Sequence, residues 1–291
     1  MLLRHAALPA LAVPALVLTT ALAACGGAQT TDDADYADAM HAEHEGETPT
    51  STPTATTDDA DASATTADVT YHADASGDVV GYHAHPDDGA TVGVVLIHEW
   101  WGLNDNIRGV ADRLAGHGFT TLAVDTYGGE SATDADGARS LMMAALDDPA
   151  ALVANTAAAA QWLRDEAGAS HVVVMGYCYG GGLSLNTAID AADAVDGAVI
   201  FYGHVTDDAD RLAAIDDPVL GFFGALDQGI PVDGVRAFEA ALTEAEVDAT
   251  IHIFEDADHA FANPSGQRYQ AEAAETAWDE TLSFLRAFEA R

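Results

Sequence analysis

The chain has 291 residues, of which 48 are acidic and ten are basic, and its formal net charge is −38. Every basic residue is an arginine, and the acidic residues are spread along the whole chain. Such a charge repels nucleic-acid phosphates, which argues against a nucleic-acid-binding protein. It also destabilises a compact state in dilute buffer, and strong salt screens it, because the Debye length falls to about 3 Å at 1 M. The composition therefore favours a salt-loving (halophilic) source.

Residues 1–25 have the features of a lipoprotein signal peptide. A short charged start is followed by an apolar stretch and then by Leu22-Ala-Ala-Cys25. These features are typical of export signals, and the last four residues resemble a bacterial lipobox, in which the cysteine is lipidated. The alternative is a transmembrane helix, which needs about 20 apolar residues, but Pro9, Pro14 and the terminal cysteine favour the lipoprotein. We expect export and anchoring of the chain to the membrane of the cell envelope, on its periplasmic or outer face, through lipidated Cys25.

Residues 26–68 have a different composition, dominated by Thr, Ala, Asp, Glu and Pro. They hold eleven acidic residues and no basic one. A segment of this kind buries too little apolar surface to offset its ordering entropy. The sequence therefore predicts an acidic, disordered tether that ends at residue 68.

Residues 69–291 are long enough for one α/β domain. Apolar runs that read as strands alternate with amphipathic stretches that read as helices. The strands are expected near 79–85, 91–97, 119–124, 171–177, 197–202, 218–226 and 249–254, and the helices near 104–117, 133–146, 149–166, 180–192, 232–243 and 269–290. This alternation predicts a mostly parallel, doubly wound sheet with helices on both faces and a site at the carboxyl ends of the strands. No inserted lid is evident, so we expect a pocket open to small molecules.

The loop after the strand near 91–97 begins His98-Glu-Trp-Trp-Gly. In enzymes of acyl transfer, a loop after an early strand supplies one backbone N–H of the oxyanion hole, and Trp100 is the natural donor here. A carboxylate beside such a hole is electrostatically unfavourable unless it has a task, which makes Glu99 unusual. Trp100 and Trp101 could equally be packing residues.

Cys178 follows the strand near 171–177 in the run Gly176-Tyr-Cys-Tyr-Gly-Gly181, after which a helix is expected. A sharp strand-to-helix turn with a reactive side chain at its apex is a nucleophile elbow, here with a thiol in place of a hydroxyl. The glycines leave room for the strained turn. The backbone N–H of Tyr179 would be the second oxyanion donor. The alternative, a structural buried cysteine, would leave the glycine spacing without a purpose.

A general base and an acid to orient it follow in the order that this fold requires. Asp227 lies just past the strand near 218–226, and His259 lies in the loop after the strand near 249–254. Neutral imidazole can accept the thiol proton, and a carboxylate on its other nitrogen fixes the tautomer. An aspartate after a strand is often only a turn residue, but the ordered trio Cys178, Asp227 and His259 predicts a catalytic triad.

The motifs around Glu99, Cys178, Asp227 and His259 together resemble the dienelactone hydrolase family, in order and spacing, from about residue 79 to residue 290. The resemblance implies an α/β-hydrolase fold and a triad of Cys178, Asp227 and His259. It also implies that Glu99 accepts the hydrogen bond of the resting thiol, so that the thiolate forms when the substrate enters.

The chain departs from the family pattern where two arginines would hold a substrate carboxylate. These places correspond here to Gly129 and Asn263. Without these cations an anionic lactone would lose charge-assisted hydrogen bonds. We therefore expect an aromatic, largely uncharged pocket mouth, formed by Trp100, Trp101, Tyr127 and Tyr179 with Asn263 beside them; packing under the loops is the alternative role for the aromatic residues.

These observations predict a cysteine-dependent hydrolase of small esters or lactones that acts through an acyl-enzyme. We expect no metal and no organic cofactor, a small-molecule ester or lactone as the partner, and a monomer. If Cys25 carries lipid and Cys178 is catalytic, no cysteine remains for a disulfide. Two alternatives stay open: a thioesterase or peptidase with the same triad, and a non-catalytic binding module on a hydrolase scaffold.

Overall fold

The computed structural model describes residues 36–42, 44–49, 64–74 and 77–291. The predicted signal peptide and the predicted lipidation site, Cys25, lie outside these residues. Within them, no helix combines the length and the apolar character that a membrane span requires.

The described residues form one eight-stranded sheet in the order β1-β2-β4-β3-β5-β6-β7-β8. Strands β3 to β8 are parallel, whereas β1 pairs with β2 and β2 with β4 in antiparallel fashion. The strands are β1 (Ala64–Asp74), β2 (Gly77–Pro86), β3 (Val92–Ile97), β4 (Thr120–Val124), β5 (His171–Tyr177), β6 (Gly197–Phe201), β7 (Val219–Gly224) and β8 (Ala249–Phe254). The seven predicted strands are thus present, and β1 is an additional one.

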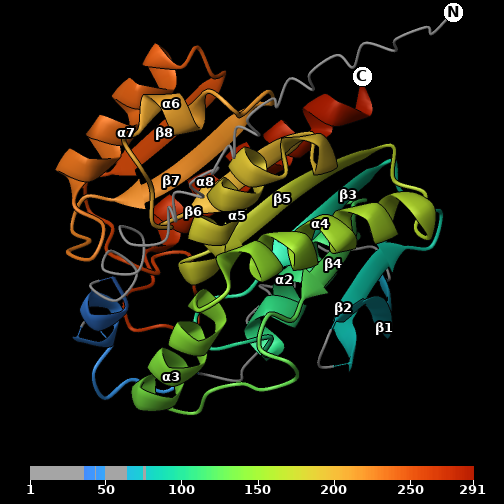
Figure 1. The fold of residues 1–291 in the computed structure, drawn as a ribbon, viewed down its shortest axis with the longest axis horizontal. Helices are drawn as coiled ribbons and strands as arrows, with labels where there is room; N and C mark the ends of the chain where they lie inside the picture. The colour runs from blue at the N-terminus through green and yellow to red at the C-terminus, as the bar shows by residue number, and fades with distance from the viewer. Residues whose placement is uncertain (1–35, 43, 50–63, 75–76) are drawn as a thin grey trace, which may run out of the picture.

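Helices cover both faces of this sheet. They are α2 (Asp105–Gly116), α3 (Ala135–Leu146), α4 (Pro149–Asp165), α5 (Tyr179–Asp190), α6 (Ala209–Leu212), α7 (Val232–Glu244) and α8 (Ala271–Glu289), with a short 3-10 turn at Ala192–Ala194. Helices α4 and α5 lie in front of the sheet in Figure 1, and α8 lies behind it. Helix α2 packs against α8, where the Arg113 guanidinium lies 3.8 Å above the Trp278 ring. The predicted doubly wound α/β architecture is therefore confirmed.

The central strands are apolar because both of their faces are covered. Every residue of β3, β4, β6 and β7 is buried, as parallel strands between two helical layers require. Gly93 in β3 also lets a helical layer approach closely, since a Cβ atom there would lie 3.0 Å from Ala169 Cβ and 3.3 Å from Leu163 Cδ1. This rigid sheet holds the loops at its carboxyl edge in fixed positions.

The prediction that residues 26–68 form a disordered tether is wrong for the parts that the structure describes. Residues 36–42 are helical, and the face that carries Tyr36, Ala37 and Met40 is buried. These apolar residues share one face because they are spaced one and four positions apart, a local pattern that the polar average composition concealed. Residues 64–68 belong to β1, so the folded domain begins before residue 69.

The short helix lies beside α3, where it appears in blue in Figure 1. Asp38 accepts a hydrogen bond from Arg139 Nε at 2.8 Å, and His41 Nε2 lies 2.8 Å from a carboxylate oxygen of Asp136. Both partners belong to α3. The contacts place this N-terminal helix near the carboxyl edge of the sheet.

The excess of acidic side chains predicts a salt-dependent stability. We expect the melting temperature to rise when KCl is increased from about 0.1 M to about 2 M, because salt screens the repulsion that accompanies a net charge of −38. Thermal unfolding followed by circular dichroism measures this change. KCl is the appropriate salt, because sodium sulfate would also strengthen the burial of apolar groups. A melting temperature that falls or stays constant with added KCl would contradict the charge argument.

Candidate active site

Four polar side chains lie in loops at the carboxyl edge of the sheet. Glu99 follows β3, Cys178 follows β5, Asp227 follows β7 and His259 follows β8. All four are less than 5% exposed. Because these strands are parallel, residues that are far apart in sequence come together at one edge.

Cys178 stands on a strained turn between β5 and α5. Its φ is 55° and its ψ is −119°, a conformation that side chains other than glycine rarely adopt. The turn leaves no room at two neighbouring glycines: a Cβ at Gly176 would overlap the Gly180 carbonyl, and a Cβ at Gly180 would lie 2.6 Å from the His98 carbonyl oxygen. The strained φ and the close backbone approach are the geometry of a nucleophile elbow.

His259 and Asp227 form a buried pair. His259 Nδ1 lies 2.8 Å from Asp227 Oδ2, and Asp227 Oδ1 accepts a hydrogen bond from the backbone N–H of Ile230 at 2.8 Å. Burial disfavours the charged imidazolium, but the negative charges of Cys178 and Asp227 and hydrogen bonds with both raise the pKa of His259 well above its ordinary value. Asp227 therefore stabilises the protonated form of the His259 ring.

Two backbone donors stand near the nucleophile. Among the described residues, neither the Trp100 N–H nor the Tyr179 N–H donates to a backbone acceptor outside the helices and strands. Tyr179 is the first residue of α5, so its N–H lies at the positive end of the helix dipole. The role of both N–H groups as oxyanion donors stays a prediction.

Glu99 faces the same site but has another partner. Its Oε2 accepts a hydrogen bond from Asn263 Nδ2 at 2.8 Å. Burial raises the pKa of Glu99 to about 7, although the charge of His259 and the Asn263 hydrogen bond lower it. The side-chain contacts of Cys178 Sγ are with Tyr36 Oη and Met40 Sδ, each at 3.8 Å. The thiol hydrogen bond to Glu99 that the resemblance implies is not made in this conformation.

The N-terminal residues 36–49 that the structure describes cover the nucleophile. Beyond Tyr36 and Met40, the His44 ring packs 4.9 Å from Trp100 and 5.6 Å from His259, measured between ring centroids. Burial lowers the pKa of His44 to about 4, so its ring is neutral at pH 7. This cover was not predicted from the sequence, because residues 36–49 lie within the predicted tether.

A small cavity of about 140 Å³ reaches the nucleophile beside this cover. Of the predicted mouth residues, Trp100, Trp101 and Asn263 line it, together with Glu99, Cys178, His259 and Arg268, whereas Tyr179 does not. Tyr127 does not line it: its ring packs 4.7 Å from His98 and 5.6 Å from Tyr179, and it borders a separate cavity.

The cavity contains a charged side chain, Arg268, that was not expected there from the sequence. Arg268 lies against His44 and is 3.4 Å from a carboxylate oxygen of Glu47. A largely uncharged pocket mouth was expected from the sequence, because Gly129 and Asn263 occupy the two positions where the family pattern has arginines. The sequence contained one indication of Arg268: it lies nine positions after His259 in a chain with only ten arginines. No group of three or more metal-ligating side chains occurs in the described part of the chain.

The first prediction from the site concerns access to the sulfur. Cys178 is only 2% exposed, and Tyr36 and Met40 contact its Sγ. We expect Tyr36→Ala and Met40→Ala each to accelerate alkylation of Cys178 by iodoacetamide by about tenfold, since a thiol must be reached before it reacts. Peptide mapping after timed alkylation gives the rate.

The matched control is Met143→Ala, which removes a half-buried methionine of α3. It should leave the rate as in the wild type. Equal rates in all four proteins would contradict the covering role of residues 36–49.

A second prediction concerns Glu99 and pH. Because the pKa of Glu99 is about 7 in the folded protein and about 4.5 when unperturbed, folding takes up a proton between these values. The protonated Glu99 carboxyl is therefore compatible with the folded state below about pH 4.5, and the folded state loses stability as the pH rises through 7 and this carboxyl becomes charged. We expect Glu99→Gln to raise the melting temperature at about pH 8 and to change it little at about pH 4.5.

The control for loss of one negative charge is Glu255→Gln, since Glu255 is exposed in the loop after β8. If Glu99→Gln shifts the melting temperature equally at both pH values, the buried carboxyl does not titrate near neutrality.

Comparison with known proteins agrees with this geometry. The model of the "Dienelactone hydrolase family" matches residues 79–289. The "Putative carboxymethylenebutenolidase" of Saccharolobus solfataricus is 31% identical over 230 residues, which cover 66% of this chain and 88% of that protein. "Protein usf" of Aquifex pyrophilus is 31% identical over 220 residues, which cover 72% of this chain and 94% of that protein.

Solved structures agree as well. The dienelactone hydrolase-like promiscuous phosphotriesterase P91 from metagenomic libraries has a TM-score of 0.70 and 26% identity, and the match covers 77% of this chain and 98% of that one. A bacterial brefeldin A esterase shares the fold, with a TM-score of 0.61 and 16% identity over 89% of this chain and 86% of its own. The chain therefore belongs to the dienelactone hydrolase family and is a hydrolase with the α/β-hydrolase fold.

Proposed function

We propose that the protein hydrolyses small carboxylic esters or lactones through Cys178, His259 and Asp227. The observation that carries this proposal is the buried His259–Asp227 pair, 2.8 Å apart, next to a cysteine on a strained turn. A binding protein has no use for this combination, because a buried ion pair is costly to desolvate and a strained φ must be maintained by its surroundings.

In the first half of the reaction, the sulfur of Cys178 attacks the carbonyl carbon of the ester. The thiol proton passes to Nε2 of His259, a C–S bond forms and the carbonyl oxygen becomes an oxyanion. The backbone N–H groups of Trp100 and Tyr179 donate hydrogen bonds to it. Asp227 holds the imidazole in the required tautomer and stabilises the imidazolium.

In the second half, the oxyanion collapses and the C–O bond to the leaving group breaks. His259 gives its proton to the leaving oxygen, and an acyl-enzyme remains on Cys178. His259 then takes a proton from water, and the resulting hydroxide attacks the thioester. The C–S bond breaks, the carboxylic acid leaves and the thiol is restored by the proton on His259.

Glu99 is proposed to hold the resting thiol neutral. Its pKa of about 7 means that a large share of the carboxyl is protonated near neutral pH. Because Tyr36 and Met40 contact Sγ in this structure, the resting contact between the thiol and Glu99 requires residues 36–49 to move aside before the substrate enters. A neutral, covered thiol also resists oxidation, which matters for an exported protein.

Export and lipid anchoring through Cys25 form part of the same proposal, as does a salt-rich environment. Their support is the lipobox-like Leu22-Ala-Ala-Cys25 and the net charge of −38. Activity should accordingly be assayed in about 2 M KCl, where repulsion is screened.

The alternative substrates of the same triad are thioesters and peptides. The cavity at Cys178 is only about 140 Å³ and is bordered by residues 44–49, which leaves no groove for a peptide while they are in place. A panel of p-nitrophenyl esters, an acyl thioester, a peptide anilide and a phosphotriester separates these reactions.

The triad gives a third prediction, on turnover. We expect Cys178→Ala to abolish hydrolysis of p-nitrophenyl acetate, and Asp227→Asn to lower kcat by about a thousandfold or more, because the wrong imidazole tautomer is favoured. Stopped-flow or steady-state absorbance of p-nitrophenol measures both variants.

Asp256→Asn is the control for Asp227→Asn, since Asp256 is exposed in the loop that precedes His259; its turnover should match the wild type. Cys178→Ala with wild-type turnover would remove the thiol from the mechanism.

A further inference from the structure

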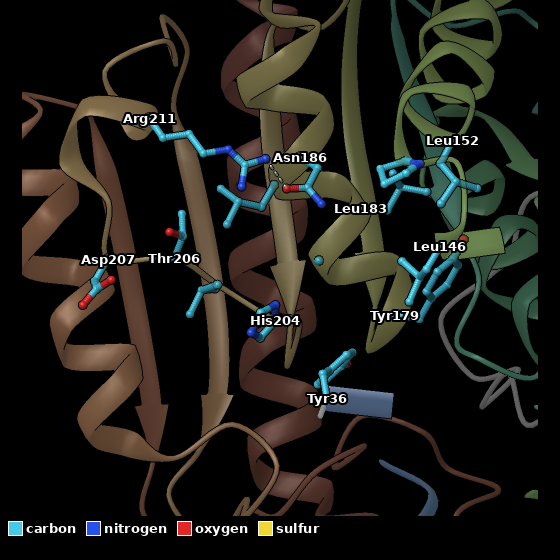
Figure 2. Close-up of a pocket in the computed structure, with 14 residues that line it drawn as sticks. Tyr36, Leu146, Leu152, Tyr179, Leu183, Asn186, His204, Thr206, Asp207 and Arg211 are labelled. Carbon is cyan, nitrogen blue, oxygen red and sulfur yellow. Dashed lines mark hydrogen bonds between the residues drawn. The ribbon is translucent and has the colours of Figure 1, made fainter. Parts of the chain in front are cut away.

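A second, larger cavity of about 230 Å³ opens beside the nucleophile elbow (Figure 2). Tyr179 and Leu183 of α5 border it, and Tyr36, which contacts Cys178 Sγ, forms one end. His259 does not border this cavity, whereas it borders the smaller one. Cys178 itself borders the smaller cavity, and the larger one is connected to its sulfur through Tyr36.

In the proposed reaction, the alcohol part and the acyl part of the ester must extend from the carbonyl carbon in different directions. His259 must donate a proton to the leaving oxygen, so the alcohol part of the ester has to lie in the cavity that His259 borders. That cavity also contains Glu99, Asn263 and Arg268, which suit a polar leaving group. The acyl part must then extend from the carbonyl carbon in the other direction.

The larger cavity has an apolar wall that fits this acyl part. Leu146 ends α3, Leu152 belongs to α4 and Leu183 belongs to α5, and Figure 2 shows the three side chains along one side of the cavity. Burying apolar carbon against leucine is favourable by about 0.8 kcal/mol per methylene, that is, about fourfold in an equilibrium or rate constant.

The end of the cavity opposite Tyr36 is polar. Arg211 Nη2 donates to Asn186 Oδ1 at 2.9 Å and to Asp190 Oδ2 at 3.2 Å, and Figure 2 shows Arg211 and Asn186 at this end. An apolar chain that reached these groups would desolvate an ion pair without replacing its hydrogen bonds. The polar end therefore limits the length of the chain.

Tyr36 lies between the sulfur and this cavity. Its Oη is 3.8 Å from Cys178 Sγ, and its ring stacks on His204 with 5.0 Å between centroids and 22° between planes. His204 and Tyr36 both border the cavity. An acyl chain longer than acetyl reaches the leucines only when the Tyr36 ring turns aside.

We propose that this leucine-lined cavity binds the acyl group of the substrate, an apolar chain of medium length, and that Tyr36 controls entry to it. The inference rests on the proposed function and specifies its substrate class. The volume of about 230 Å³ is below the roughly 300 Å³ of sites that hold a whole small molecule. At about 30 Å³ for each water-sized unit, it holds at most about eight carbon atoms.

The test is a series of p-nitrophenyl esters from acetate to decanoate, assayed in about 2 M KCl. For the wild type, kcat/KM should rise from acetate to hexanoate, by up to about fourfold per methylene, and fall at decanoate. Leu146→Trp fills the cavity and should lower the ratio of hexanoate to acetate kcat/KM by about tenfold or more.

Leu141→Trp is the matched control. Leu141 is a half-buried leucine of the same helix that borders a different cavity, so this variant should keep both the wild-type ratio and the wild-type acetate activity. Tyr36→Ala provides a second, opposite change: it should raise kcat/KM for hexanoate more than for acetate. Melting temperatures establish that each variant is folded.

The outcomes separate this inference from the function on which it rests. If acetate is hydrolysed in a Cys178-dependent way but Leu146→Trp and Tyr36→Ala leave the chain-length ratio unchanged, the acyl site is refuted and the hydrolase is not. If Tyr36→Ala raises both rates equally, Tyr36 only covers the sulfur and the proposed control of acyl entry is refuted. Absence of Cys178-dependent turnover of any ester overturns both proposals.

Discussion

The hydrogen bond between His259 and Asp227 is the constraint on which the rest of the site depends. It joins two loops that follow different strands, and both side chains are almost fully buried. Burial disfavours a charged imidazole in such a place, yet Asp227, and Cys178 once it is ionised, raise the pKa of His259 well above its ordinary value. The parallel sheet is what keeps the three groups in reach of each other, because β5, β7 and β8 end at the same edge.

Two features around this pair suggest how substrates are chosen. A polar cavity lies on the side of His259, and a cavity with a leucine wall and a polar end lies beyond Tyr36, so the surroundings of the nucleophile differ between the two directions. The N-terminal residues 36–49 contribute to both: Tyr36 borders the apolar cavity, and His44 and Glu47 border the polar one. A segment that appears dispensable by composition therefore borders both cavities in this structure.

The sheet could be predicted from the sequence, whereas the packing of residues 36–49 over the nucleophile could not. Buried parallel strands such as β3 and β7 are continuous apolar runs, and the elbow around Cys178 needs glycines at fixed positions, so both leave a local signal. The packing of Tyr36 and Met40 on Cys178 joins residues about 140 positions apart and leaves none. Arg268 was missed for a similar reason, since its place in the cavity depends on the path of the loop after His259. Strand β1 was missed because its residues 64–68 have the composition of the preceding segment.

The most direct test of the central claim is covalent trapping of the acyl-enzyme. The protein is mixed with p-nitrophenyl hexanoate, quenched in acid within the first turnover and digested for mass spectrometry. The account predicts a hexanoyl group on the peptide that carries Cys178, and loss of this adduct in His259→Ala. Full esterase activity with the acyl group on another side chain, or with no acyl group on any, would contradict it.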